Sequence, residues 1–447
     1  MMLSKQQMTS ISLKTINKLA IPALIAGIAE PVLSITDTAI VGNIDVNATE
    51  SLAAVGIVGT FISMLIWVFG QSRSAISSIV SQHLGAQKLD DIKNLPAQAI
   101  FVITSLSLII IAITFPFAKV IFKLYNASDL ILDYSIVYYK IRVFGFPFTL
   151  FTMAIFGVFR GLQNTFYPML IAIIGASLNI FLDIILVYGV ENYIPPFNII
   201  GAAYASVIAQ IVMALLSAFF VIRKTDIPLK ITFPFNKEIK RFLIMIANLF
   251  IRTISLNVAL YFASAFATSY GKSFIAAYTI AINIWFLGAF VIDGYASAGN
   301  ILSGKLLGAK EYNTLLELGN KLIKYGIIIG LIMMIFGALV YYPLGTVFSK
   351  DEAVLNEFYN VFWVVLVMQP LCALAFIYDG IFKGLGRMKF LRNVLIFSTF
   401  LVFVPTLFIL DSLQLKLYAI FIAFTLWIAA RGIPLIIKFR KMFIPLI

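Results

Sequence analysis

The 447-residue sequence is poor in the side chains that carry most enzyme chemistry. It contains one cysteine, Cys372, and one histidine, His83. A single cysteine rules out a disulfide within the chain, so nothing indicates an oxidising compartment. A glycine-rich phosphate-binding loop, a zinc motif and a nucleophile elbow are also missing from the sequence. We therefore expect neither ATP hydrolysis nor metal-assisted or serine hydrolysis, and we predict a protein that is not an enzyme and needs no cofactor.

Charge is scarce as well. Charged residues make up 12% of the chain, whereas 61% of it is hydrophobic and the mean hydropathy is +1.00. These values lie far outside the range of soluble domains. A helix needs about 20 apolar residues to cross a bilayer, and the runs here are long enough for that. The breaks between runs predict twelve spans, near 16–43, 51–83, 95–122, 132–159, 166–188, 199–222, 239–268, 273–303, 318–346, 354–382, 389–410 and 413–437.

The basic residues predict the orientation of these spans. The chain opens on a polar, basic segment without the apolar core of a signal peptide, so we expect the first span to insert uncleaved. Of the 33 Lys and Arg residues, twenty-four fall in loops on the side of the N-terminus, and only Arg73 and Arg252 are expected inside spans. We therefore expect a multi-pass protein of the plasma (bacterial inner) membrane with both termini cytoplasmic.

The distribution of Lys and Arg residues also indicates which partners to expect. The net charge of +13 is explained by basic residues in cytoplasmic loops, and the aromatic residues are not interleaved with a basic patch. We expect small organic molecules and membrane lipids as partners, no nucleic acid, and a monomer.

The chain repeats itself at half its length. GVFRGL at 157–162 matches GIFKGL at 380–385, and LGA at 84–86 matches LGA at 307–309. LAA at 52–54 matches IAA at 275–277, and all three pairs are 223 residues apart. We predict an all-α protein with two parallel six-helix lobes, 1–222 and 242–447, around a central cleft, joined by a cytoplasmic linker at 223–241. This is the architecture of an alternating-access transporter.

Two aspartates, Asp37 and Asp183, stand out among the polar residues in the predicted spans of the first lobe. Asp183 interrupts the apolar run 170–190, with Asn179 one helical turn earlier, and Asp37 lies in the first span. A carboxylate at the middle of a spanning helix costs about 2.5–3.5 kcal/mol, so its retention indicates an ion or substrate path. At the offset of the repeat, Asp37, Asn179 and Asp183 correspond to Leu260, Val402 and Thr406, so this pair of acids has no acidic counterpart in the second lobe.

Depth connects these residues with Ser206. A rise of about 1.5 Å per residue places Asp37, Asp183 and Ser206 at a similar level, roughly 8–10 Å below the external surface. Asn179 lies one turn deeper on the face of Asp183. Carboxylate, amide and hydroxyl oxygens at one level form either a hard oxygen site for Na⁺ or a carboxylate pair that shares a proton.

Other polar residues within spans are candidates for substrate binding or gating. Glu30 and Arg252 have matching depths in opposite lobes, which suits either an ion pair across the cleft or a substrate contact. Asp293 and Asp379 lie nearer the cytoplasmic ends of their spans, where they could hold Arg252, Lys383 or backbone groups in place. The remaining candidates are helix-bending residues in the first span, Pro22 and Pro31.

Several of these segments resemble one family. The patches DTAIVG around Asp37, LNIFLDIILVYG around Asp183, GAAYAS before Ser206, GVFRGLQNT and SQHLGAQ resemble the multidrug and toxic compound extrusion (MATE) transporters. In the second half, IRTISL, DGYASAGNILSGKLLGA and YDGIFKG resemble its DinF-like branch. The resemblance implies a cation-coupled efflux carrier whose coupling site is formed by Asp37, Asn179, Asp183 and Ser206, the last at a position where the family usually has threonine.

We therefore predict an antiporter that exports organic, cationic and aromatic compounds by alternating access. Protons are favoured over sodium as the coupling ion. The alternative is a flippase for lipid-linked oligosaccharides or lipids with a related two-lobe fold, which would be expected to carry a cluster of cavity arginines. An integral-membrane acyltransferase would need a partner for His83, and a channel would need a ring-forming motif.

Overall fold

The computed structural model describes residues 11–44 and 47–446 of the chain, and most of these residues are helical. In these ranges the only strand-like pairing is one isolated bridge between Val190 and Ile194. Eleven helical segments in the described part are long and apolar enough to cross a membrane, and α1 (Leu13–Val41) is a further helix of 29 residues. The predicted class, an all-α protein with many membrane-spanning helices, is confirmed.

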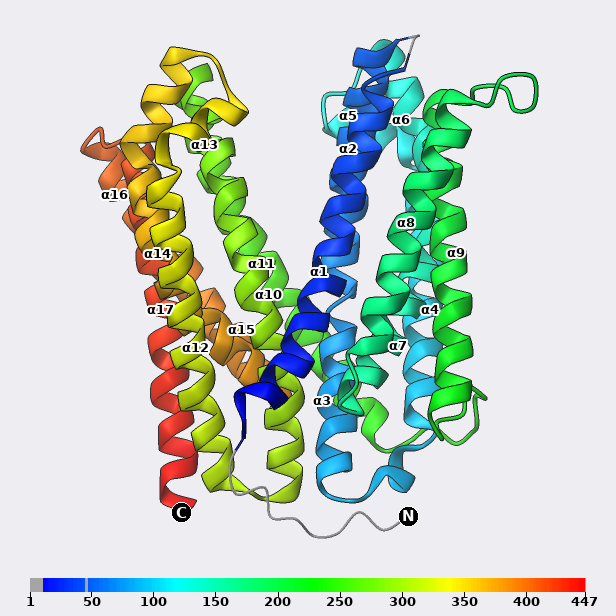
Figure 1. Cartoon of the computed structure of the whole chain (residues 1–447), viewed down its shortest axis with the longest axis vertical. Helices are drawn as coiled ribbons and strands as arrows, with labels where there is room; N and C mark the ends of the chain where they lie inside the picture. The colour runs from blue at the N-terminus through cyan, green and yellow to red at the C-terminus, as the bar shows by residue number, and fades with distance from the viewer. Residues whose placement is uncertain (1–10, 45–46, 447) are drawn as a thin grey trace. The chain divides into compact units, whose positions relative to one another are not determined.

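Contacts divide the described residues into two compact units (Figure 1). The N-proximal unit comprises Ile25–Val80 and Lys88–Ile246. It holds the later part of α1, most of α3 (Ser72–Gly85), and the helices α2 (Ala48–Phe69), α4 (Leu95–Thr114), α5 (Ala118–Leu124), α6 (Asp129–Arg142), α7 (Phe146–Gly161), α8 (Phe166–Tyr188) and α9 (Asn198–Lys224).

The C-proximal unit contains the rest of the described chain. Besides the residues from Ala247 onward it takes in the start of α1, up to Leu24, and the segment Ser81–Gln87 at the end of α3. The predicted lobes 1–222 and 242–447, and the linker between them, therefore stay a prediction. The helices of the C-proximal unit are most of α10 (Glu238–Ser269), α11 (Lys272–Ala309), α12 (Tyr312–Leu339), α13 (Tyr341–Phe348), α14 (Glu352–Gly384), α15 (Met388–Phe397), α16 (Val404–Ser412) and α17 (Leu417–Phe443).

Local sequence explains where two helices begin. Proline lies in the first turn of α4, where its missing N–H group would have had no helical partner. At the start of α14, Asp351 Oδ1 accepts hydrogen bonds from the backbone N–H groups of Ala353 and Val354, at 2.9 and 3.5 Å. These are the N-terminal groups that a helix leaves without partners of its own.

Large apolar side chains cover the outer faces of the helices. On α4, Leu108, Ile109 and Ile113 are 55%, 54% and 59% exposed. Contiguous apolar exposure of this kind is unusual on a soluble monomer. It is the surface that a helix presents to lipid, which agrees with a membrane location.

Within each repeat, a glycine allows two helices to pack in close contact, and the two glycines occupy corresponding positions. A Cβ atom added to Gly157 on α7 would lie 2.6 Å from the carbonyl oxygen of Arg73 on α3. At the positions 223 residues further on, a Cβ atom on Gly380 of α14 would lie 2.1 Å from the carbonyl oxygen of Ala296 on α11. The motifs GVFRGL and GIFKGL thus match because each places a glycine where two helix backbones touch.

The segment between α9 and α10 is fixed to the start of α4. Gln98 Nε2 donates a hydrogen bond to the carbonyl oxygen of Thr232 at 2.7 Å, and its Oε1 accepts one from the N–H of Asn236 at 2.7 Å. Asn236 Nδ2 in turn donates to Asn94 Oδ1, at 2.7 Å. Side-chain amides therefore satisfy the backbone groups of this non-helical connection.

Candidate coupling-ion site

Four polar side chains predicted from the sequence lie in the N-proximal unit. Asp37 comes from the last turns of α1, Asn179 and Asp183 from one face of α8, and Ser206 from α9. All four residues are buried, and Asp183 is fully enclosed, with 0% exposure. Burial of two carboxylates within one helical bundle is expensive unless protons, cations or hydrogen-bond donors compensate it.

Hydrogen bonds connect three of the four residues. Asn179 Nδ2 donates to Ser206 Oγ at 3.5 Å, and Ser206 Oγ donates to Asp37 Oδ2 at 3.1 Å. The hydroxyl at position 206 therefore links the amide of α8 to the carboxylate of α1. The structure brings these residues together as their spacing and depth predicted.

Several carboxylate oxygens are left without a donor. Among the described residues, none donates a hydrogen bond to Asp37 Oδ1 or to either side-chain oxygen of Asp183, and all three atoms are buried. The carboxyl groups of Asp37 and Asp183 are close enough to share a hydrogen bond once one of them carries a proton. A proton or a small cation would supply the positive charge that these oxygens lack.

Two further residues belong to this cluster and were not identified from the sequence. Tyr138 and Arg142 lie one helical turn apart on α6, and both are within electrostatic range of Asp183. Arg142 lies inside the helical segment Asp129–Gly161. Its spacing from the buried Tyr138, four residues earlier, was the available signal.

The donor set of the site fits a monovalent cation better than a transition metal. No group of three or more His, Cys, Asp or Glu side chains that could hold a metal ion occurs in residues 11–44 and 47–446. Two carboxylates, one hydroxyl and one amide oxygen are hard oxygen ligands, which suit Na⁺ as well as a shared proton. The identity of the coupling ion stays a prediction.

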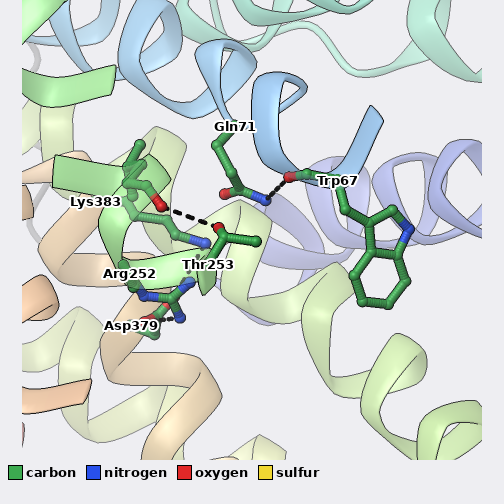
Figure 2. A network of polar contacts seen from close by, with 7 residues as sticks. Trp67, Gln71, Arg252, Thr253, Asp379 and Lys383 are labelled. Atoms are coloured by element: carbon green, nitrogen blue, oxygen red, sulfur yellow. Dashed lines mark hydrogen bonds and ion pairs between the residues drawn. The ribbon is translucent and has the colours of Figure 1, made fainter. Parts of the chain in front are cut away.

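A second buried cluster lies in the C-proximal unit (Figure 2). Arg252 Nη2 on α10 is 2.5 Å from Asp379 Oδ1 on α14, and Lys383 Nζ is 2.9 Å from Asp379 Oδ2. Asp379 thus pairs with both cations, one from another helix and one from the next turn of its own. A role of Arg252 and Asp379 in substrate binding or gating stays a prediction.

Two other arginines are buried in helices. Arg160, in the last turn of α7, is 5% exposed, and Arg431 on α17 is 4% exposed. The α17 helix continues for twelve residues beyond Arg431, to Phe443. The expectation that only Arg73 and Arg252 lie inside spans stays a prediction.

The remaining candidates from the sequence are Glu30, Pro22, Pro31 and Asp293. The side chains of Glu30 and Pro31 lie outside the described residues, so the proposed Glu30–Arg252 pair is untested. The backbone of α1 is helical through Pro22 and position 31. The transition between the two compact units falls between these prolines, at Leu24 and Ile25. Asp293 on α11 is exposed rather than buried.

Fold and site together define a polytopic membrane protein built from two related helical halves, with a buried acidic cluster in one of them. The sequence profile of the MatE family matches this chain twice, over residues 22–185 and 245–409. The chain belongs to the MatE family, a family of transporters. The two matches start 223 residues apart, which confirms the repeat.

Related proteins include bacterial and plant members. DNA damage-inducible protein F of Escherichia coli is 24% identical over 438 residues, covering 96% of this chain and 92% of that protein. Multidrug resistance protein MdtK of Edwardsiella ictaluri is 26% identical over 398 residues, covering 88% and 86%. Protein DETOXIFICATION 43 of Arabidopsis thaliana is 29% identical over 249 residues, 55% of this chain but only 46% of the plant protein. The chain thus matches about half the length of some relatives.

Solved structures agree with the fold. A crystal structure of MATE in the bent conformation superimposes with a TM-score of 0.89 at 23% identity, covering 97% of this chain and 96% of that one. An outward-facing multidrug resistance MATE family transporter gives 0.85, with the same identity and coverage. At this identity the comparison supports the fold, and the site must be argued from its own residues.

Proposed function

We propose that this protein is a cation-coupled antiporter that exports organic compounds by alternating access. The observation that carries the proposal is the buried pair Asp37 and Asp183, three of whose oxygens have no donor in the described part of the chain. A bound positive charge stabilises a site of this kind, so its occupancy can be linked to a conformational change.

Protons are the favoured coupling ion. A proton taken up by Asp183 would hydrogen-bond to Asp37, and Ser206 and Asn179 would hold Asp37 in place. Sodium would use the same oxygens and remains the second possibility. The change of charge is passed on by α1, which carries Asp37 and also contributes to both compact units. Pro22 and Pro31 lie on either side of that transition and weaken the helix locally.

The exported compounds are proposed to be organic, cationic and aromatic. A positively charged compound and the coupling cation would both neutralise the carboxylates, which makes their binding mutually exclusive. Two relatives, MdtK of Edwardsiella ictaluri and NorM of Vibrio vulnificus, are named multidrug resistance proteins. We extend that activity to this chain as part of the proposal.

The setting follows from the orientation of the spans. We place the protein in the plasma membrane as a monomer with both termini cytoplasmic, in contact with lipids and without nucleic-acid partners. Export from the cytoplasm then uses an ion gradient directed inward.

A flippase for lipids or lipid-linked oligosaccharides is the alternative. It is kept because the C-proximal unit buries Arg252 and Arg431, the kind of basic cluster that such a function requires. Inverted vesicles separate the two: an antiporter accumulates drug when an ion gradient is imposed, whereas a flippase moves labelled lipid without one.

The proposal is tested in proteoliposomes loaded with a fluorescent organic cation. A proton gradient or a sodium gradient is imposed separately, and efflux is recorded for wild type and for Asp183→Asn. We expect efflux under the proton gradient, and none above background in the variant. Efflux that depends on neither gradient would contradict the antiport mechanism.

A further inference from the structure

The buried cluster of the C-proximal unit carries more positive than negative charge. Arg252, Lys383 and Arg431 surround one carboxylate, that of Asp379. Among the described residues of this unit, Asp379 is the only buried acid. Three cations and one carboxylate leave a net charge of +2 in a region shielded from water, which costs free energy unless an anion is present.

Arg431 is the cation without an anionic partner. It is 4% exposed, and its Nη1 atom is buried with no hydrogen-bond partner in the described part of the chain. Lys383 and Arg252 already occupy the two oxygens of Asp379. Arg431 lies within electrostatic range of both Asp379 and Arg252, and its guanidinium contacts Phe376, one helical turn before Asp379 on α14.

Aromatic rings hold Arg431 in position. Its guanidinium carbon lies 4.5 Å from the centre of the Trp427 ring and 5.4 Å from that of Phe376. Stacking on aromatic faces satisfies the plane of a guanidinium but leaves the N–H groups at its edge free to donate. Arginine with free edge donors is the usual partner of carboxylate and phosphate groups, which it binds through two parallel hydrogen bonds.

The repeat makes the contrast between the halves clear. Arg252 and Arg431 correspond to Ala29 and Ile208 at the 223-residue offset, just as Asp37 and Asp183 correspond to Leu260 and Thr406. Lys383, in contrast, corresponds to Arg160, which is also buried, so the added charges of the second half are the two arginines Arg252 and Arg431.

From these observations we infer that the cluster of Arg252, Lys383, Arg431 and Asp379 binds the oxyanion group, carboxylate or phosphate, of an amphipathic ligand. The edge of Arg431 would bind the oxyanion, and the neighbouring rings of Trp427 and Phe376 would contact the apolar part. This anion site is additional to the proposed export of organic cations, and its binding does not rest on that export function.

The test compares three ligands of the same size that differ in charge. Full-length protein in nanodiscs of neutral phosphatidylcholine is titrated with radiolabelled 2-naphthoate, 2-naphthamide or 2-naphthylmethylammonium, and empty nanodiscs correct for partitioning. We expect naphthoate to bind about tenfold more tightly than the amide, as is typical of a charge-assisted hydrogen-bonded pair. Equal affinities of the anion and the amide would overturn the inference.

Substitutions with opposite expected signs identify the site. Arg431→Gln should weaken naphthoate binding about tenfold and leave the amide unchanged, while Arg431→Lys should recover part of the loss. Asp379→Asn should strengthen naphthoate binding, because it frees Arg252 and Lys383 from their internal partner. The matched control is Arg440→Gln, an exposed arginine on the same helix, which should have no effect.

A cluster that is only structural gives a different pattern. In that case Asp379→Asn would either weaken the binding of every ligand or leave it unchanged. Either result would overturn the inference, even if Arg431→Gln failed to fold. Asp183→Asn should abolish coupled export but retain naphthoate binding, so failure of the export proposal is distinguishable from failure of this one.

A final arm distinguishes the two sources of the oxyanion. Phosphatidylglycerol is added to the nanodiscs at about one fifth of the lipid. If phosphatidylglycerol lowers the naphthoate affinity of wild type but not that of Arg431→Gln, the result would support the site and identify a lipid phosphate as its occupant. Unchanged affinity would support a soluble organic anion.

Discussion

At the scale of single residues, the acidic cluster depends on the charge of its two carboxylates. Asp37 and Asp183 are buried, and Ser206 Oγ donates a hydrogen bond to Asp37 at 3.1 Å. Replacing either acid by asparagine keeps the size of the side chain but removes the group that can gain and lose a proton.

We therefore expect Asp37→Asn and Asp183→Asn each to reduce ion-driven efflux to background without loss of expression. Asn179→Ala should retain part of the activity, because Asn179 contributes a dipole rather than a charge. Efflux rates in proteoliposomes, normalised to the amount of folded protein from size-exclusion chromatography, provide the measurement. Wild-type efflux in either acid variant would remove that residue from the coupling site.

The sequence was sufficient to predict this group of four residues, for identifiable reasons. Asn179 and Asp183 are four residues apart on one helix, so periodicity alone puts them on one face. The cost of a buried carboxylate singled out Asp37 and Asp183. Arg431 was missed because it lies between two apolar stretches, and the packing of Trp427 and Phe376 around it involves two helices that sequence spacing does not connect.

At the scale of helices, close backbone contact is the feature most sensitive to small changes. A Cβ atom on Gly380 would be 2.1 Å from the carbonyl oxygen of Ala296, too close for any side chain. In the middle of α2, a Cβ atom on Gly59 would meet nothing within 4 Å. Gly59 is therefore a suitable control for a substitution at Gly380, since both glycines are helical and only Gly380 is in close contact.

Gly380→Ala should destabilise the protein by about 1–3 kcal/mol, because α11 and α14 would have to separate. Gly59→Ala should be neutral or stabilising, by up to about 1 kcal/mol, since alanine favours helix more than glycine does. Thermal unfolding in detergent, followed by the amount of protein that stays monodisperse, measures both. An equal loss of stability in the two variants would contradict the packing argument.

The bending of α1 is a prediction at the same scale. Pro22→Ala restores a backbone hydrogen bond that proline cannot make, which stiffens the helix between the two compact units. We expect slower efflux with substrate binding unchanged. Pro96→Ala is the control, because proline in the first turn of α4 replaces no helical hydrogen bond. Equal rates in wild type and Pro22→Ala would argue against a bending role.

At the scale of the whole molecule, the sequence predicted the repeat and the helices better than the positions of charges. Three short matches at one offset were enough, because each repeat must bury the same small residues where its helices touch, as Gly157 and Gly380 do. The limits of the compact units were harder to predict. Residues 81–87 group with the C-proximal unit through contacts such as that of Gly85 with Lys305, which no local pattern encodes.

The repeats have diverged in charge while keeping their packing. Buried acids lie in the N-proximal unit, and a buried cluster with excess positive charge lies in the C-proximal unit. We assign ion coupling, and its competition with a cationic compound, to the acids of the N-proximal unit, and the binding of an oxyanion to the cations of the C-proximal unit. This assignment predicts that the movement of substrate and the movement of the coupling ion are tied through Asp183.

The most direct test of that claim reverses the direction of coupling. Proteoliposomes are loaded with substrate and a pH-sensitive dye and then diluted into substrate-free buffer at the same pH, so that only the substrate gradient drives transport. For wild type, the account predicts that substrate efflux acidifies the interior, because antiport is reciprocal. For Asp183→Asn it predicts no acidification. Substrate efflux from wild type without proton uptake, repeated with and without sodium, would contradict proton coupling.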